Sequence, residues 1–193
     1  MAKLTEIRWH GRGGQGAKTA ALLFGEAVLG QGQHMQAFPE YGPERMGAPV
    51  QSYNRISDDP ITLHCGVTSP QVVVVLDPTL IGTIDVTHGL PADGTIIINT
   101  NLPAAKFREK LNLGNGQKIY TIDASKIAEE TIGRNIPNTP MMGALVRVTG
   151  LVRFEDMLED TKKKLEKKFR TKPEVIEGNI QAIQRAYDEV NAD

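Results

Sequence analysis

The residues best suited to chemistry lie near the start of the chain, in the string Gly11-Arg12-Gly13-Gly14-Gln15-Gly16. This G-x-G-x-x-G string follows a short β-prone run, residues 6–10, and precedes an apolar-periodic segment, residues 17–29. In a strand–turn–helix context the first glycine is expected to form the tight turn, the second to let backbone approach a ligand, and the third to let the helix pack close to the strand. The free N–H groups of the first helical turn then favour an anion.

A dinucleotide is the first ligand to test against this loop. An NAD-binding fold places an acidic residue at the end of the second strand, about 20 residues further on, to hold the ribose hydroxyls. Here the predicted second strand ends at Phe38, and Glu40 follows only after Pro39. Phe38 is a poor partner for ribose, so the sequence argues against NAD.

A nucleoside triphosphate is the second candidate. The stretch from Gly11 to Thr19 almost matches the phosphate loop G-x-x-x-x-G-K-[ST], and residues 72–77 resemble an apolar strand that ends in a metal-binding aspartate. Ala17 is one residue too many, and each helical residue advances about 100°, so Lys18 and Thr19 leave the positions that meet phosphate and Mg²⁺. A third interpretation is therefore favoured on the residues alone: a structural loop, a docking surface or a seat for some other phosphate.

Other candidate chemistry is sparse. Cys65 falls in a predicted strand and is interpreted as a buried small hydrophobic residue. Asp77 and Asp123 follow predicted strands and could equally cap the next helices or react. Four histidines show no metal-ligand spacing with each other or with acidic residues: His10, His34, His64 and His88. No catalytic constellation or metal site is predicted.

Composition limits the classes of function. The 193 residues are 40% hydrophobic and 23% charged, with a formal net charge of −1, which fits a globular protein and gives no basic field for nucleic acid or an anionic membrane. A single cysteine cannot hold an Fe–S cluster or form a disulfide within the chain. Without a membrane-spanning or secretory apolar run, the sequence is expected to be cytoplasmic.

The glycine string must be positioned by an α/β framework. Continuous β-branched runs at 72–77 and 95–99 are typical of central parallel strands, and 118–123 is a further candidate. Strands are also predicted at 4–10, 33–38, 50–56 and 61–65, the last two joined as a hairpin through residues 57–60, with an irregular stiff loop from Pro39 to Pro49. Helices are predicted around 102–111 and 125–132, which gives a Rossmann-like, doubly wound, mostly parallel sheet with an inserted β-hairpin.

The last third is predicted to be helical. One helix is expected to start at residues 138–140, with Thr139 as its cap and Pro140 in its first turn, and two more helices cover 154–169 and 173–190. The lysines at 162–168 are interpreted as a solvated helix face paired with acidic residues. The whole chain, 1–193, is interpreted as a single domain with an α/β core (1–150) and a C-terminal helical extension (151–193).

Several strings taken together resemble the gamma subunits of pyruvate:ferredoxin oxidoreductases (pyruvate synthases) in the 2-oxoacid:ferredoxin oxidoreductase family. The match extends over nearly the whole chain, and the Phe-Pro-Glu-Tyr and Asn-Thr-Pro-Met strings are most similar to the pyruvate and ketoisovalerate branches. The matching strings occur at 11–18, 38–45, 47–49, 69–70 and 136–145.

The resemblance implies one subunit of a larger enzyme, with alpha, beta and delta-type partners. Such an enzyme converts a 2-oxoacid and coenzyme A to an acyl-CoA and CO₂ and passes electrons to ferredoxin. Thiamine diphosphate, Mg²⁺ and Fe–S clusters would lie in other subunits, so this chain alone is expected to be inactive. A ketoisovalerate or other 2-oxoacid enzyme, or a free-standing nucleotide-binding protein, remains an alternative.

Two contributions of this chain follow as hypotheses. The glycine loop, with Arg12 and Lys18, would bind or guide the phosphates of coenzyme A. Alternatively, the chain would be a scaffold that docks catalytic subunits, since stiff Pro/Gly loops lose little entropy on binding. Met141, Met142 and Leu145 could instead be plain core. The residues predicted at the interface are Tyr41, Gly42, Pro43, Glu44, Arg45, Asn138, Thr139, Pro140 and Met141.

Overall fold

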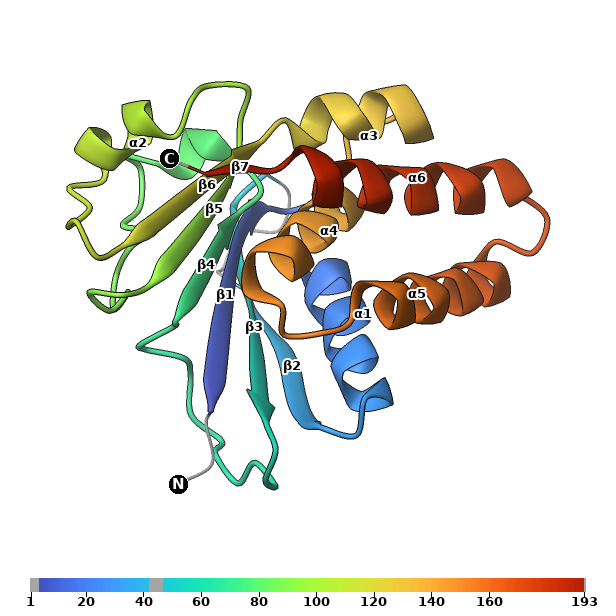
Figure 1. Ribbon diagram of the computed structural model, residues 1–193, viewed down its shortest axis with the longest axis horizontal. Helices are drawn as coiled ribbons and strands as arrows, with labels where there is room; N and C mark the ends of the chain where they lie inside the picture. Colours follow the sequence, from blue (N-terminus) through green and yellow to red (C-terminus); the bar gives the residue numbers. More distant parts are fainter. Residues whose placement is uncertain (1–3, 42–46, 193) are drawn as a thin grey trace.

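A mixed seven-stranded sheet forms the centre of the computed structural model, which describes residues 4–41 and 47–192 (Figure 1). The strands lie in the order β2-β3-β1-β4-β5-β6-β7. Their bounds are β1 Thr5–Arg12, β2 His34–Tyr41, β3 Pro49–Ser57, β4 Val72–Val75, β5 Thr95–Asn99, β6 Lys118–Ile122 and β7 Asn191–Ala192.

Strand direction confirms the predicted α/β fold. β1, β4, β5 and β6 are parallel neighbours, and β4 and β5 have the fully buried, β-branched composition of central strands. β3 is antiparallel to both β1 and β2, so it separates two strands that run in the same direction. The crossover from β1 through the first helix to β2 therefore passes over β3.

The inserted hairpin exists, but it is formed by β2 and β3, and the predicted pairing of 50–56 with 61–65 was wrong. β3 uses both of its edges, one for β1 and one for β2, so no edge remains for residues 61–65. That segment has no regular structure and is mostly exposed. Cys65 is exposed with it, which corrects its interpretation as a buried residue.

Pro39 lies inside β2, which continues to Tyr41, so residues 39–41 of the predicted stiff loop belong to a strand, and residues 42–46 lie outside the described residues. Within the described residues β2 is the outermost strand on its side of the sheet and pairs only with β3, where Pro39 lies opposite Ser52. Proline is tolerated at such an edge because its missing N–H can face away from the ladder.

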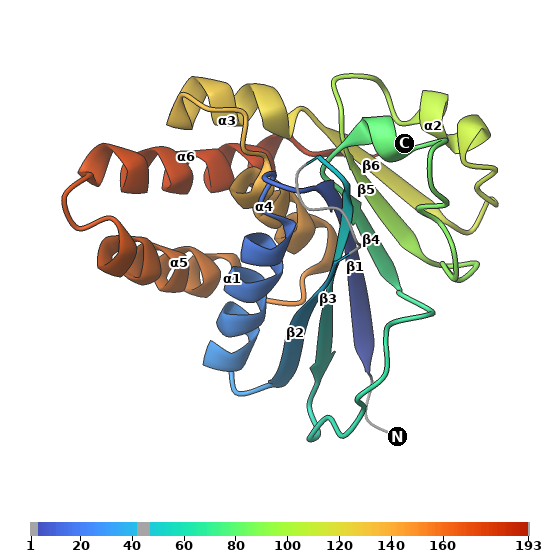
Figure 2. The ribbon, with the colours of Figure 1, turned by 180° about the vertical axis from the view of Figure 1, so that it is seen from behind.

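Helices cover the two faces of the sheet unequally. The bounds are α1 Ala17–Gly30, the 3₁₀ turn η1 Pro78–Leu80, α2 Ala105–Lys110, α3 Ala124–Ile132, α4 Asn138–Thr149, α5 Phe154–Lys168 and α6 Pro173–Glu189. α1, α3, α4, α5 and α6 contribute to the core on one face, whereas η1 and α2 lie on the other (Figures 1 and 2). Figure 2 shows α5 and α6 extending away from the sheet, with α5 beside α1 and α6 next to α3 and α4.

α4 lies at the centre of the helical layer. Met141, Met142 and Leu145 are completely buried, which confirms that they are core residues. α6 packs so closely on α4 that a Cβ at Gly143 would lie 2.2 Å from the carbonyl oxygen of Ile183. Only glycine fits there, and the C-terminal helix is thus part of the main core.

None of the described helices combines the length and the hydropathy needed to cross a lipid bilayer.

Candidate functional site

The glycine loop lies at the carboxyl ends of the parallel strands, where β1 leads into α1. The chain leaves β1 toward the helical face and leaves β4 toward the opposite face, where Leu80 of η1 is buried. Ligands of open α/β sheets bind at such a switch point. The predicted strand–loop–helix context of the glycine string is therefore confirmed.

The glycines take roles that differ from those expected. Gly11 lies within β1 opposite Val50 and not in the turn. A Cβ there would meet Ala17 and Leu76 at ordinary contact distances, 3.5 and 3.6 Å, so this position does not require glycine. The turn itself is formed by Gly14 and Gly16, whose φ angles are +100° and +83°.

Gly16 is also the point of closest approach. A Cβ there would lie 2.7 Å from Nδ2 of Asn138, the first residue of α4. This contact joins the two helix N-termini that the sequence singled out separately.

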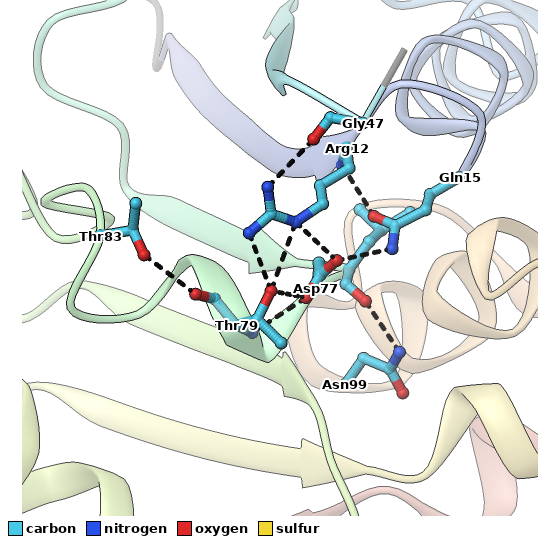
Figure 3. A network of polar contacts seen from close by, with 8 residues as sticks. Arg12, Gln15, Gly47, Asp77, Thr79, Thr83 and Asn99 are labelled. Carbon is cyan, nitrogen blue, oxygen red and sulfur yellow. Dashed lines mark hydrogen bonds and ion pairs between the residues drawn. The ribbon is translucent and has the colours of Figure 1, made fainter.

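One side of the loop is closed by a polar network that joins Arg12 and Gln15 of the loop to Asp77 and Thr79 of the segment after β4 (Figure 3). Nε of Arg12 lies 3.2 Å from Oδ2 of Asp77, and its other nitrogens donate to Oγ1 of Thr79 and to the carbonyl of Gly47. The amide of Gln15 accepts from N–H of Arg12 and donates to Asp77 at 2.8 Å. Arg12, predicted to meet a ligand phosphate, is thus paired with a carboxylate of the chain itself.

Asp77 is ionised in this network. Its burial raises the pKa of its carboxyl, but hydrogen bonds from the hydroxyl and N–H of Thr79 and from Gln15, together with the charge of Arg12, outweigh burial and leave the pKa below its ordinary value. Asp77 caps η1, and Asp123 caps α3 by accepting from N–H of Lys126. The capping interpretation of both aspartates is confirmed.

The other side of the loop opens on a cavity of about 490 Å³ between α1, α4, α5 and α6. Three cationic side chains line it from three different segments: Arg134 before α4, Lys168 at the end of α5 and Lys172 before α6. Glu174 is the acidic residue on its wall. The rest of the lining is Gly14, Gly16, Thr19, Leu23, Ile132, Ile136, Asn138, Thr139, Leu165, Phe169, Val175 and Asn179.

Asn138, the first residue of α4, lies on this wall and is 8% exposed as a residue. The neighbouring Thr139 does not cap α4 as predicted, because the cap position is Pro137 and the Thr139 hydroxyl donates to Oδ1 of Asn179 at 2.9 Å. The buried side-chain atoms without a hydrogen-bond partner among the described residues lie elsewhere, at Nδ1 of His10 and Oγ of Ser52.

Lys18 lies exposed in the first turn of α1, and within the described residues it has no ion pair. The cations that do line the cavity were not identified from the sequence. Lys168 was included in a solvated helix face, and Arg134 was not considered. The sequence feature that could have indicated these cations is the positive charge of the segments that flank α4 and α6.

The predicted interface residues divide into two groups. Tyr41 ends β2, and Gly42, Pro43, Glu44 and Arg45 lie outside the described residues. Asn138, Thr139, Pro140 and Met141 are all buried within this single chain. Burial places Met141 in the core, where it offers no surface to a partner.

Among the described residues no three His, Cys, Asp or Glu side chains lie together as metal ligands would. His10 is buried and accepts from Nε of Arg8 at 2.9 Å, while Arg8 also donates to the carbonyls of Val86 and His88. Burial, and then the charge of Arg8, lowers the pKa of His10 to about 3, so it is a neutral acceptor inside the fold.

Comparison with known proteins gives consistent matches. The family model for pyruvate ferredoxin/flavodoxin oxidoreductase matches residues 6–189. The pyruvate synthase subunit PorC of Thermotoga maritima is 49% identical over 188 residues, which cover 97% of this chain and 95% of that protein. The pyruvate/ketoisovalerate oxidoreductases common subunit gamma of Pyrococcus furiosus is 42% identical, with 96% of each chain covered.

Solved structures agree on the fold. The crystal structure of the Thermotoga maritima pyruvate oxidoreductase subunit PORC superposes with a TM-score of 0.86, at 46% identity and 99% coverage of both chains. A 2-oxoglutarate:ferredoxin oxidoreductase from Magnetococcus marinus, solved with 2-oxoglutarate, coenzyme A and succinyl-CoA bound, gives a TM-score of 0.77. At 18% identity and 31% coverage of its length, that likeness concerns the fold alone.

Proposed function

This chain belongs to the pyruvate ferredoxin/flavodoxin oxidoreductase family as a gamma subunit, and we propose that in the assembled enzyme it docks the catalytic subunits and guides coenzyme A. The reaction of the complex is the interconversion of pyruvate plus coenzyme A with acetyl-CoA plus CO₂, with electrons passing to ferredoxin. The alpha, beta and delta-type subunits are its proposed partners. The two relatives named above are both subunits of larger enzymes, which supports partner subunits for this chain.

The 2-oxoacid of the complex has one alternative. The Pyrococcus furiosus relative is named as common to pyruvate and ketoisovalerate enzymes, which keeps a 2-ketoisovalerate enzyme as the alternative. A family match over residues 6–189 argues against a free-standing nucleotide-binding protein.

The redox centres are proposed to lie in the partner subunits. A chain with one cysteine has too few thiolates for an Fe–S cluster, and its residues do not fit one. Thiamine diphosphate and Mg²⁺ are likewise assigned to other subunits. The chemistry of this chain is binding and orientation.

The cavity beside the glycine loop is the observation that carries the role with coenzyme A. Gly14 and Gly16 bring the N-terminus of α1 to the cavity, and three cationic side chains face the same space. Helix N-termini and cations both favour phosphate. Of the residues predicted for this role, Gly14 and Gly16 line the cavity and Lys18 is near them in the chain, whereas Arg12 and Gln15 support the loop from the network side.

Titration calorimetry of coenzyme A with the assembled enzyme tests this role. A Gly14→Asp variant puts a carboxylate beside the cavity, where a Cβ meets nothing within 4 Å, and we expect at least about a tenfold loss of affinity. Gly32→Asp is the matched control, because Gly32 also has a positive φ and open space but lies at the other end of α1. Equal affinity in both variants would remove coenzyme A from this loop.

The docking role is assigned to the segment from Tyr41 to Arg45. A Tyr41→Ala, Arg45→Ala double variant carrying an affinity tag is expected to recover less of the partner subunits than the wild type does. Recovery of the whole complex at wild-type yield would place the docking surface elsewhere.

A further inference from the structure

We propose that the turn between α5 and α6 carries a docking surface for the small acidic protein that takes electrons from the complex. This inference rests on the proposed function, because it assumes an assembled enzyme that reduces such a carrier. It gives this chain a part in meeting the carrier, whereas the proposed function concerns coenzyme A and the partner subunits.

Positive charge is concentrated at the end of the molecule where α5 leads into α6. Residues 162–172 contain seven of the 22 lysines and arginines of the chain and only one acidic residue, Glu166. The chain as a whole has a formal net charge of −1, so this segment is strongly polarised against the rest. Figure 1 shows that the connection between α5 and α6 projects away from the sheet, where another protein can reach it.

Most of these cations have no carboxylate partner among the described residues. Lys163 pairs with Glu159 at 2.6 Å, and Lys164 pairs with Glu26 at 2.9 Å and with Asp160. The interpretation of this face as lysines paired with acidic residues holds for these two. The other five are exposed and form no ion pair with any residue that the structure describes, and we call them the basic tip: Lys162, Lys167, Lys168, Arg170 and Lys172.

The charge of the basic tip exceeds what α5 needs for its own stability. A helix C-terminus is equivalent to about half a negative charge, and Lys167 and Lys168 in the last turn already oppose it. Lys163 and Lys167 are four residues apart, as are Lys164 and Lys168, and like charges at that spacing repel each other. An acidic surface placed against the basic tip would relieve this repulsion.

The composition of the basic tip fits a partner that binds briefly. Permanent subunit interfaces have an apolar core, but the exposed large hydrophobic side chains among the described residues lie elsewhere, at Leu22, Leu29, Leu63 and Leu102. Complementary charge speeds association more than it strengthens binding, which suits a carrier that arrives and leaves during turnover. The basic tip takes no part in electron transfer itself and raises the local concentration of the carrier beside the subunits that reduce it.

Steady-state oxidation of pyruvate by the assembled enzyme tests the proposal, with two electron acceptors compared. The protein acceptor is a ferredoxin with an acidic surface, and the small acceptor is the cationic dye methyl viologen, which a basic surface does not attract. The test variant is Lys162→Gln, Lys167→Gln and Arg170→Gln, which leaves the cavity-lining Lys168 and Lys172 in place. At low ionic strength we expect kcat/KM for the ferredoxin to fall at least about fivefold, because steering raises association rates by about 10–10³-fold, while the rate with the dye is unchanged.

A second triple variant, Lys106→Gln, Lys110→Gln and Lys118→Gln, is the matched control. It removes the same charge from exposed positions in α2 and at the start of β6 that form no ion pair within the described part of the chain. We expect kcat/KM for the ferredoxin to change less than about twofold there. At an ionic strength of about 0.5 M the difference between the test variant and wild type should disappear, because the Debye length is then only about 4 Å.

Three other outcomes would overturn the proposal. Equal falls in the two variants would show that net charge alone attracts the carrier. A fall with the dye as well as with the ferredoxin, or a lower recovery of the partner subunits, would show that these cations serve catalysis or assembly. An unchanged kcat/KM for the ferredoxin in the test variant would place the docking surface on another subunit.

The response to coenzyme A separates this inference from the proposed function. If Gly14→Asp leaves the affinity for coenzyme A unchanged while the test variant loses only its rate with the ferredoxin, the basic tip stands and the guiding role is wrong. If Gly14→Asp weakens coenzyme A while the test variant keeps its rate with the ferredoxin, the guiding role stands and the basic tip is wrong.

Discussion

The two sides of the glycine loop carry similar side chains and are put to opposite uses. On the β4 side, Arg12 is paired with Asp77 and bound to Thr79 and to the carbonyl of Gly47. On the α4 side, Arg134, Lys168 and Lys172 line a cavity and form no ion pair with a carboxylate of the described residues, although Glu174 lies on the same wall. A cation next to a glycine loop is therefore no guide to ligand binding until its own partners are known.

The largest effect is expected where the two sides meet, at Gly16. In Gly16→Ala the new Cβ lies 2.7 Å from Asn138 at a φ of +83°, and we expect the free energy of unfolding to fall by about 3 kcal/mol. Gly14→Ala, with φ +100° and open space, should lose only the backbone cost of about 1–2 kcal/mol. Urea denaturation measures both, and equal losses would show that Asn138 does not confine Gly16.

The second largest effect is expected from removing Asp77, which destabilises the network on the β4 side of the loop. Asp77→Ala removes the carboxylate partner of the Arg12 guanidinium, leaves the Gln15 amide without its acceptor and removes the cap of η1. We expect a loss of about 2 kcal/mol in the free energy of unfolding. A loss below about 0.5 kcal/mol would mean that water replaces the carboxylate.

Single charge removals should separate the two sides functionally. Lys168→Gln is expected to raise the KM for coenzyme A about fivefold, because one charge-assisted contact is lost. Arg12→Gln is expected to change that KM less than about twofold while lowering stability by about 1 kcal/mol. Steady-state kinetics of the assembled enzyme gives the KM values, and urea denaturation of each variant gives the stabilities. A larger rise in KM for Arg12→Gln than for Lys168→Gln would place the ligand on the Arg12 side.

The smallest effect concerns pH. The pKa of Asp77 lies below its ordinary value of 3.8 in the folded protein, so the unfolded chain takes up the proton first as the pH falls. The stability that Asp77 contributes is therefore complete well above pH 4 and is lost as the pH drops through the lower, folded-state pKa. The stability difference between wild type and Asp77→Asn, about 1 kcal/mol at neutral pH, should shrink below pH 4, and a constant difference would exclude an ionised Asp77.

The framework could be predicted from the sequence because its signals are local. The β-branched run of β4 and the apolar periodicity of α1 each specify their own element, and both lie where they were expected. The strand predicted at residues 61–65 was wrong because its formation depends on a distant partner and not on a local signal. Whether a short apolar run becomes a strand depends on a free edge, and β3 leaves none.

The site was predictable only in part, for the same reason. The glycine string specifies a strand, a turn and a helix, but the partner of Arg12 is Asp77, 65 positions away in the chain and visible only after folding. Arg134, Lys168 and Lys172 converge because α4 and α5 pack on α1 and α6 packs on α4 and α5. No periodicity or spacing in the sequence reports that convergence.

The position of β3 between β1 and β2 has a consequence for biosynthesis. As the chain leaves the ribosome, β1, α1 and β2 emerge first, and the two strands have no hydrogen-bonded contact with each other. The space between them is filled only by residues 49–57, so the amino-terminal quarter of the protein must wait for a later segment before its strands can be joined.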